Sequence, residues 1–479
     1  MTSFDYSNHN NHPIPVIQET PTTQLQHQTE AEVRPYFVNL LQLNPSELQN
    51  LQQIGYLSAS TESTTDDNDF KIRLLTDKHQ TYVSQVWTPP QNQLPSGFVS
   101  LNASRPWILY WCLHSHDLLS TKSSIPESDR QRMLTLVKNC WSEIELELSR
   151  DDVQGDAFLQ SQVKSNSNSI LTAGGFGGGP GQLAHAATTY AAVLALCILA
   201  TLDDTKSTSQ RQALEFLIHI RPKLYPWMLA LQDTDTGAYR MHDGGEIDVR
   251  ASYCVLCVAK LLQLPLHQLA SPKVVNFIAS CQTYEGGLGG VPFAEAHGGY
   301  TFCGVAALAL VDQLDQLNTD TLLGWLTRRQ CSYEGGFAGR AEKLVDGCYS
   351  FWQGAALSIV SSHFLKNPES DPDDDNDQTF FLGHAQVLER YILLCAQEPK
   401  GGLRDKPSKP RDFYHTCYNL SGLSIVLSSQ TESEQCFGHP SNQEHLGQTH
   451  PLYNIRVERV QKIQELLSKV DHASNVSST

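Results

Sequence analysis

The pattern of apolar and polar positions along the chain predicts helices almost throughout. Helical spacing is weak from about residue 34 to residue 85, where the polar run 58–69 interrupts it, and it strengthens from Leu101 onward. The longest apolar run, around 190–201, is too short to span a bilayer. Almost no stretch alternates apolar and polar residues as a half-buried strand does. The sequence therefore predicts an all-α protein with few strands.

The first strong helix is expected in LNASRPWILYWCLHSHDLL, which starts at Leu101. Ser104 and Pro106 suit the start of a helix, because serine caps free backbone N–H groups and proline fits the first turn. Trp107 and Trp111 recur at helical spacing. Core packing is the simplest explanation for such a stripe of aromatic residues.

Glycine-rich turns recur after residue 169 at separations of roughly fifty residues, which is typical of a helical-hairpin repeat. Most of them are preceded by a glutamine and followed by a helix rich in small residues. One helical pair cannot bury its apolar face alone, so several pairs must pack together. This predicts an α/α toroid, with an inner ring of closely packed helices inside an outer one. The turns are GGFGGGPGQ, DTGAY, YEGGLGG, YEGGFAG and PKGGLRD, and the glutamines are Gln232, Gln282, Gln330 and Gln397.

We expect one toroid domain at residues 101–470, because its repeats cannot be separated without exposing their cores. Two polar insertions interrupt it, at 366–378, which is strongly acidic, and at 428–449. A helical extension at 33–100 precedes the toroid. The two ends, 1–32 and 471–479, are expected to be disordered tails.

Charge and cysteine usage narrow the function classes. The formal net charge of -17 argues against nucleic acid or an anionic membrane as the main partner. The 12 cysteines are scattered, and many lie in apolar helical runs, where a reduced cysteine behaves as a small hydrophobic residue. No N-terminal signal peptide is evident, since the first residues are polar. We therefore expect a reduced, cytoplasmic protein that is not integral to a membrane.

The stretch 334–353, EGGFAGRAEKLVDGCYSFWQ, combines the chemical groups of a functional site. Two cations precede Asp346 and Cys348, which are a hard and a soft metal ligand, and aromatic residues follow them. A catalytic zinc site needs only three protein ligands and keeps one position open. His415, at a comparable place in the next repeat, is the third candidate. Taken alone, an Asp-x-Cys pair with a distant histidine is a weak signal for a metal.

Basic residues follow the glycine turns of successive repeats. Arg250, His297 and Arg340 with Lys343 occupy comparable places, so we expect them to converge at one end of the ring. Basic groups gathered by an acidic chain favour a concentrated anion such as a diphosphate. Ordinary ion pairing is the alternative, and its candidate partners are Glu246, Asp248, Glu295 and Glu342.

Two further motifs have structural explanations. Cys254 and Cys257 form a lone CxxC pair on an apolar helix, and we expect them in the core. Asp371, Asp373 and Asp374 spell the acidic D-x-D-D motif of terpene cyclases, which also use α/α toroids. Here the motif lies in a polar insertion that offers no buried site for a protonated aspartate, so we interpret it as a charged loop.

Six runs of sequence resemble the β subunits of the protein prenyltransferase family, specifically those of protein farnesyltransferase. The similarity extends over roughly residues 101–424, with a trailing HPLYNI at 450–455. These runs are long and occur in the family's order, which an accidental match does not produce. They are SRPWILYW, GGFGGGPGQ, GGEIDVR, YEGGLGGV with EAHGGYTFCG, EGGFAGR with KLVDGCYSFWQ, and GGLRDKP with RDFYHTCYNLSGLS.

The resemblance implies an α/α toroid that pairs with a separate α subunit. It implies transfer of a farnesyl group from farnesyl diphosphate to the cysteine of a C-terminal CaaX motif, in proteins such as small GTPases. Three residues match zinc ligands, Asp412 fits a supporting role behind them, and Asp405 matches a carboxylate implicated in binding Mg²⁺. The zinc set is Asp346, Cys348 and His415, and the catalytic set adds Lys343 and Tyr349.

The resemblance also implies where the two substrates bind. The diphosphate and isoprenoid positions are Arg250, Tyr253, His297, Gly298, Gly299, Tyr300, Cys303, Arg340, Lys343, Tyr349 and Trp352. The positions for the peptide's terminal residues are Ser104, Trp107, Trp111, His185, Ala187 and Tyr414.

Bulk at two positions favours a farnesyl donor over a longer one. Trp107 and Tyr418 stand where the farnesyl enzymes close their cavity and the geranylgeranyl enzymes have smaller residues. The β subunit of a type I geranylgeranyl enzyme is the nearest alternative. A terpene cyclase and a non-catalytic α/α-toroid binding module are more remote, since neither needs all three zinc-ligand candidates. Departures around His185, at Leu183, Ala184 and Thr188, leave the preferred last residue of the CaaX motif open.

Overall fold

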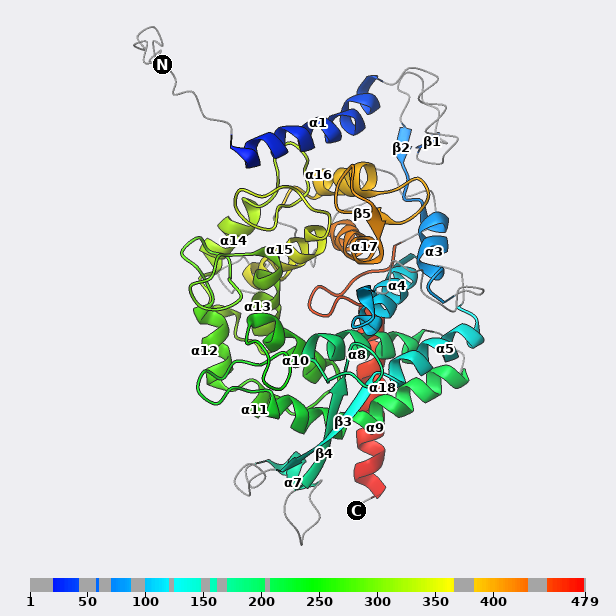
Figure 1. Ribbon diagram of the computed structural model, residues 1–479, viewed down its shortest axis with the longest axis vertical. Helices are drawn as coiled ribbons and strands as arrows, with labels where there is room; N and C mark the ends of the chain where they lie inside the picture. The colour runs from blue at the N-terminus through cyan, green and yellow to red at the C-terminus, as the bar shows by residue number, and fades with distance from the viewer. Residues whose placement is uncertain are drawn as a thin grey trace, which may run out of the picture.

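The computed structural model describes residues 20–42, 57–59, 70–87, 100–119, 125–147, 156–161, 170–202, 207–365, 383–429 and 446–477. Six helices in these ranges form a closed inner ring, because each packs on the next and the last returns to the first (Figure 1). The predicted α/α toroid is confirmed. In ring order the inner helices are α4 (Arg105–Leu119), α8 (Ala186–Thr201), α10 (Val249–Leu261), α13 (Gly298–Leu310), α15 (Tyr349–Leu365) and α17 (Phe413–Ser428).

The inner helices are apolar on all sides because they lie between two layers. Nearly every residue of α8, AATTYAAVLALCILAT, is buried. Small residues let neighbouring helices approach closely. A Cβ atom added at Gly422 of α17 would stand 2.5 Å from the backbone of Ser350 on α15.

The outer helices cover the ring from outside, as Figure 1 shows for α12 and α14 beside α13 and α15. They are amphipathic: α12 buries Val274, Val275, Phe277 and Ile278 toward the ring. The outer elements are α3 (Thr76–Ser84), α5 (Glu127–Lys138), α9 (Thr208–Ala230), α12 (Pro272–Ser280), α14 (Thr319–Thr327) and α16 (Ala385–Arg390) with the π-helical turn η3 (Tyr391–Ala396).

The repeated glutamines tie each glycine turn to the next outer helix. Gln282 donates to the carbonyl of Gly286 (2.9 Å) and exchanges two hydrogen bonds with the backbone of Asn318, which caps α14. Gln330 does the same for Gly335 and the backbone of His384, just before α16. The glutamine that the sequence pattern singled out therefore holds one repeat against the next.

The last of these glutamines closes the ring onto the N-terminal extension. Gln397 accepts from the backbone N–H of Leu75 (2.8 Å) and donates to the carbonyl of Arg73 (3.0 Å), immediately before α3. His79 of α3 lies 2.8 Å from Gln397 and accepts from the N–H of Gly402 (2.8 Å). Helix α3 is therefore the outer partner of α4, and the toroid begins before the expected boundary at residue 101.

The structure also differs from the expected tails. Helix α1 (Pro21–Gln42) begins inside the segment 1–32, and α18 (Val457–Ser477) continues into the segment 471–479. The acidic insertion 366–378, including the D-x-D-D motif, lies outside the described residues, as does 430–445 within the second insertion.

The described strands form three small antiparallel pairs, in line with the prediction of few strands. The longest pair was not foreseen, and it projects from the base of the molecule in Figure 1. Among the described residues, no helix combines the length and apolar character that crossing a membrane requires. The pairs are β1 (Leu57–Ala59) with β2 (Phe70–Ile72), β3 (Trp141–Glu147) with β4 (Ile170–Phe176), and β5 (Leu403–Arg404) with β6 (Arg411–Asp412), and the remaining short helices are α7 (Ala157–Gln160), α11 (Leu266–Leu269) and η2 (Leu314–Gln316).

Candidate functional site

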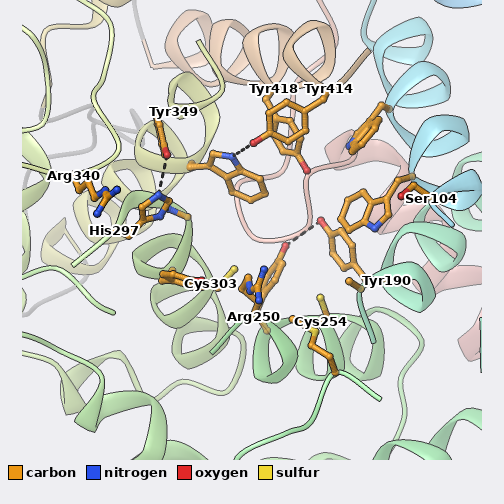
Figure 2. Close-up of a pocket in the computed structure, with 18 of the residues that line it drawn as sticks. Ser104, Tyr190, Arg250, Cys254, His297, Cys303, Arg340, Tyr349, Tyr414 and Tyr418 are labelled. Carbon is orange, nitrogen blue, oxygen red and sulfur yellow. Dashed lines mark hydrogen bonds between the residues drawn. The ribbon is translucent and has the colours of Figure 1, made fainter. Parts of the chain in front are cut away.

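The inner helices surround a cavity of about 790 Å³, shown in Figure 2. This volume lies in the range of about 300–1,000 Å³ that is usual for pockets that bind small molecules and cofactors. Most of its wall is aromatic or aliphatic, and its charged groups are few. The lining residues are Ser104, Trp107, Trp111, Ala187, Tyr190, Met241, Arg250, Tyr253, Cys254, Ala294, Glu295, His297, Gly299, Tyr300, Cys303, Arg340, Tyr349, Trp352, Tyr414 and Tyr418.

The tyrosines of the inner helices hold the segment that precedes α18 against the ring. Tyr190 donates to the carbonyl of Tyr453 (3.1 Å), and Tyr253 donates to the carbonyl of Leu452 (2.9 Å). These residues belong to the trailing HPLYNI motif. Its backbone therefore lies against two residues of the cavity wall.

Bulky rings fill another part of the wall. Tyr418 is 1% exposed, and its ring centroid lies 4.4 Å from that of Trp352 and 4.7 Å from that of Tyr414. Trp107 packs on Trp111 with centroids 5.6 Å apart. The two positions predicted to limit the donor length are therefore large in the structure and line the cavity.

Five of the six inner helices, all except α4, begin after a glycine turn at the same rim. His185, Asp248, His297 and Asp412 cap α8, α10, α13 and α17 with their side chains. Asp346 similarly accepts from the N–H of Cys348 (2.9 Å) just before α15. Several helix N-termini, each with a partial positive charge, therefore face one end of the ring, which suits an anion.

Of the basic residues expected to converge, Arg250, His297 and Arg340 all line the cavity, and Lys343 does not. Figure 2 shows Arg340, His297 and Tyr349 together on one side of the cavity. The Nδ1 atom of His297 accepts from the N–H of Gly299 (3.1 Å), while its Nε2 atom lies 3.0 Å from the Tyr349 hydroxyl. Burial, followed by the charge of Arg340, lowers the pKa of His297, so the neutral ring is favoured.

Two of the expected ion pairs also form. Arg250 contacts both carboxylate oxygens of Asp248 and lies over the ring of Tyr300, with its guanidinium carbon 5.3 Å from the centroid. Arg340 pairs with Glu295. Convergence and ion pairing thus occur together, since carboxylates pair with both Arg250 and Arg340.

Asp346, Cys348 and His415 come together although 69 residues separate the first from the last. Their candidate ligand atoms all lie within 4.8 Å of one another, and Cys348 is buried. The Nε2 atom of His415 faces Asp346 at 3.1 Å, and its Nδ1 atom faces Asp412 at 2.7 Å. Such a carboxylate–histidine contact is the usual support of a metal-binding imidazole.

The charges of this cluster favour a cation. Burial works to raise the pKa of Asp346, but the hydrogen bond and charge of His415 outweigh it and lower that pKa. Burial works to lower the pKa of His415, yet its hydrogen bonds to Asp346 and Asp412 raise it to about 10. Burial, and then the Asp346 charge, raise the pKa of the Cys348 thiol. A proton on His415 thus balances the two carboxylates in the absence of a metal ion.

Seven predicted site residues are not among the residues that line the cavity, namely Asp346, Cys348, His415, Lys343, His185, Gly298 and Asp405. Lys343 is exposed. Asp405 is held by Lys406, whose Nζ donates to both carboxylate oxygens (2.8 and 2.7 Å). The carbonyl of Asp405 also accepts from the N–H of Gly347 (2.8 Å), which links two site-bearing loops.

The expected core positions of Cys254 and Cys257 are confirmed, since both are buried and reduced. Cys254 also lines the cavity, which the sequence analysis missed. Tyr190 could have been found from the repeat register, because it follows the cap of its helix at the same distance as Tyr253 does. The lining residues that sequence reasoning missed are Tyr190, Met241, Cys254, Ala294 and Glu295.

Comparisons with known proteins place this site in a family. The model of the prenyltransferase α/α-toroid domain matches residues 74–455. The β subunit of protein farnesyltransferase from Arabidopsis thaliana is 37% identical over 428 residues, covering 79% of this chain and 78% of the relative. That from Schizosaccharomyces pombe is 39% identical over 350 residues, covering 73% of this chain and 77% of the relative.

Geranylgeranyl enzymes are less similar. The β subunit of the type-1 enzyme from Arabidopsis thaliana is 31% identical over 263 residues, covering 53% of this chain and 61% of the relative. A solved structure of Candida albicans protein geranylgeranyltransferase-I complexed with GGPP has a TM-score of 0.57, 21% identity, and coverage of 82% of this chain and 99% of that one; it shows the fold alone. The chain belongs to the prenyltransferase family and, within it, to the β subunits of protein farnesyltransferase, which are prenyltransferase enzymes.

Proposed function

We propose that the chain is the catalytic β subunit of a zinc-dependent protein farnesyltransferase. It would join a farnesyl group from farnesyl diphosphate to the cysteine of a C-terminal CaaX motif, as a heterodimer with an α subunit. The observation that carries this proposal is the Asp346–Cys348–His415 triad beside a cavity that combines a basic rim with an aromatic wall.

The triad suits a catalytic zinc ion by its donor set. An oxygen, a sulfur and a nitrogen atom are all ligands that Zn²⁺ accepts, and three protein ligands leave a fourth position for a substrate thiol. When bound, Zn²⁺ lowers the pKa of such a thiol and so raises the share of its reactive, deprotonated form. Asp412 fixes the orientation of the His415 ring through Nδ1.

The basic rim would hold the diphosphate and stabilise it as it leaves. In the transfer, a bond forms between the cysteine sulfur and C1 of the farnesyl group, while the bond from C1 to the diphosphate oxygen breaks. The diphosphate keeps the electron pair, and the thiol proton goes to solvent. His297, Arg340, Tyr349 and the exposed Lys343 would offset the growing negative charge, which is the largest electrostatic demand of the reaction.

Gly298 and Gly299 would contribute through the partial positive charge at the start of α13, since their own N–H groups donate to the carbonyl of Gly339 and to Nδ1 of His297. The isoprenoid chain would lie along the wall formed by Tyr253, Tyr300, Cys303 and Trp352, with Arg250 beside it.

The opposite side of the cavity would receive the peptide. We assign its terminal residues to Ser104, Trp107, Trp111, Ala187 and Tyr414, with His185 just outside the wall. The bulk of Trp107 and Tyr418 supports a C15 donor rather than a C20 donor.

Mg²⁺ at Asp405 is the weakest of these assignments. Both carboxylate oxygens already accept hydrogen bonds from Lys406, and the residue lies outside the cavity wall. We therefore assign no step of the transfer to Asp405.

The test is zinc content together with transfer to a dansylated CaaX peptide, using the chain co-expressed with a farnesyltransferase α subunit. We expect one zinc ion per heterodimer, as the single triad among the described residues predicts, and transfer from the C15 donor. Zinc with transfer from the C20 donor alone would keep the chemistry and overturn the donor assignment. If the heterodimer contained no zinc and transferred no prenyl group, the proposed function would be overturned.

A further inference from the structure

Glu295 lies at the cavity wall next to the proposed diphosphate position, and its carboxylate pairs with Arg340. We propose that Glu295 is a built-in competitor of the diphosphate: it holds Arg340 in the ligand-free site, and the arriving diphosphate displaces it. The inference rests on the proposed function, because it concerns the same anion position. It assigns to Glu295 a tuning of diphosphate binding and release.

The ion pair between Arg340 and Glu295 is weak enough for another anion to replace Glu295. The side chains of Arg340 and Glu295 are 41% and 51% exposed, so water screens their attraction and the pair is held weakly. A diphosphate carries more charge than one carboxylate and, like a carboxylate, can accept two N–H donors of a guanidinium at once. The diphosphate would therefore displace Glu295 from Arg340 without disturbing the fold.

The neighbouring Arg250–Asp248 pair has the opposite character. The Asp248 side chain is 9% exposed and caps α10 by accepting from the backbone N–H of Arg250 (2.8 Å). Its position is therefore required by the helix. Glu295 caps no helix, since His297 caps α13, and Arg340 is its only hydrogen-bond partner within the described ranges. The fold does not need the Glu295 carboxylate.

The backbone before Glu295 makes a left-handed turn. Phe293 adopts a left-handed φ of 67°, although its side chain is fully exposed. The turn also folds tightly onto Gly289, where an added Cβ atom would stand 2.6 Å from the carbonyl oxygen of Ala294. A left-handed residue also stands four positions before the cap in neighbouring repeats, at Gly244, Glu342 and Ser408, so this turn belongs to the repeat. In this repeat the turn presents Ala294 and Glu295 at the cavity wall.

A carboxylate at this point repels the diphosphate group of the donor, and it also repels the diphosphate product after transfer. Its charge lowers the affinity for the donor, but it also helps the leaving diphosphate to depart. Glu295→Gln removes the charge and keeps the size and the turn. This variant should bind diphosphate more tightly and release it more slowly.

Inorganic diphosphate is the probe, because its binding to the heterodimer can be measured by calorimetry without any transfer. We expect Glu295→Gln to lower its Kd about five- to tenfold, with the gain shrinking as salt rises. Its inhibition constant in the transfer assay should fall in parallel. Glu342→Gln is the matched control, because it removes the same charge. Glu342 is exposed, lies two residues after Arg340, and has no ion-pair partner in the described part of the chain. It should change the Kd less than twofold.

Weaker diphosphate binding in Glu295→Gln would mean that the carboxylate supports Arg340 in a productive pose, and it would overturn the inference. An equal gain in both variants would overturn it as well, since only net charge would matter. The two proposals can fail separately. If Glu295→Gln tightened diphosphate binding as predicted but the wild-type heterodimer transferred no prenyl group, only the proposed function would be refuted.

Discussion

Asp412→Asn tests whether the triad is a metal site by changing a residue that does not belong to it. Asp412 uses two oxygens: Oδ1 accepts from the backbone N–H of His415 (2.7 Å), and Oδ2 accepts from the His415 ring (2.7 Å). An asparagine has a single oxygen and can satisfy only one of them. Because asparagine is as good a helix cap as aspartate, we expect the cap to persist and the ring to lose its support.

The expected effect is specific to the metal. Loss of a carboxylate behind a metal-binding histidine lowers metal affinity about 10- to 100-fold, which corresponds to about 1.4–2.7 kcal/mol. The unfolding free energy of the zinc-free heterodimer should change by less than about 1 kcal/mol, since the cap is kept. Transfer should therefore fail at limiting zinc and recover when zinc is added.

The assay is competition for zinc against a chelator of known affinity, run beside thermal unfolding of the same heterodimer. Asp248→Asn is the matched control, because Asp248 also caps an inner helix but contacts Arg250 instead of His415. Its zinc affinity should equal that of the wild type. If Asp412→Asn bound zinc as tightly as the wild type, the histidine would not depend on this carboxylate, and the metal-site reasoning would be refuted.

Three further outcomes follow from the structure. Cys348→Ala should abolish zinc binding and nearly all transfer while the heterodimer still folds, because its small buried side chain contributes little to stability, on the order of 1 kcal/mol; normal transfer without zinc would contradict the mechanism. Trp107→Thr with Tyr418→Phe should raise the ratio of C20 to C15 kcat/KM by at least about tenfold, since each buried CH₂ group gains about 0.8 kcal/mol; an unchanged ratio would refute the depth argument. Burial lowers the pKa of His79 to about 4 from 6.5, so the unfolded chain takes up a proton first as pH falls. The contribution of His79 to the unfolding free energy should thus be fully present above pH 6.5 and fall by about 3 kcal/mol toward pH 4. Chemical unfolding measured across this pH range should show that His79→Gln lacks this decline.

The sequence predicted the ring and the triad for different physical reasons. The ring was accessible because glycine turns and small-residue helices repeat, and a repeat must stack to bury its apolar faces. The triad was a weak signal in spacing alone, and the resemblance to a family made it specific. The structure then brought Asp346, Cys348 and His415 within 4.8 Å of one another.

What the sequence did not predict depends on contacts between distant segments. Helix α3 was assigned to an extension, because nothing in its own sequence states that Gln397 and Gly402 bind it. Helix α1 begins at Pro21, within a run rich in polar residues that resembles a disordered tail. Glu295 was considered only as an ion-pair partner, since its place at the cavity wall depends on the left-handed turn at Phe293.

Capping and chemistry share the same side chains in this ring, and this has a consequence for mutagenesis. Asp346, His297 and Asp412 each accept a backbone N–H at the start of an inner helix and each also belongs to the candidate site. A change to alanine there removes a cap, at a cost of about 0.5–2 kcal/mol, together with a functional group. Loss of activity in such a variant would not separate chemistry from folding. Substitutions that keep an acceptor, such as aspartate to asparagine, are therefore the ones that can assign a function to these residues.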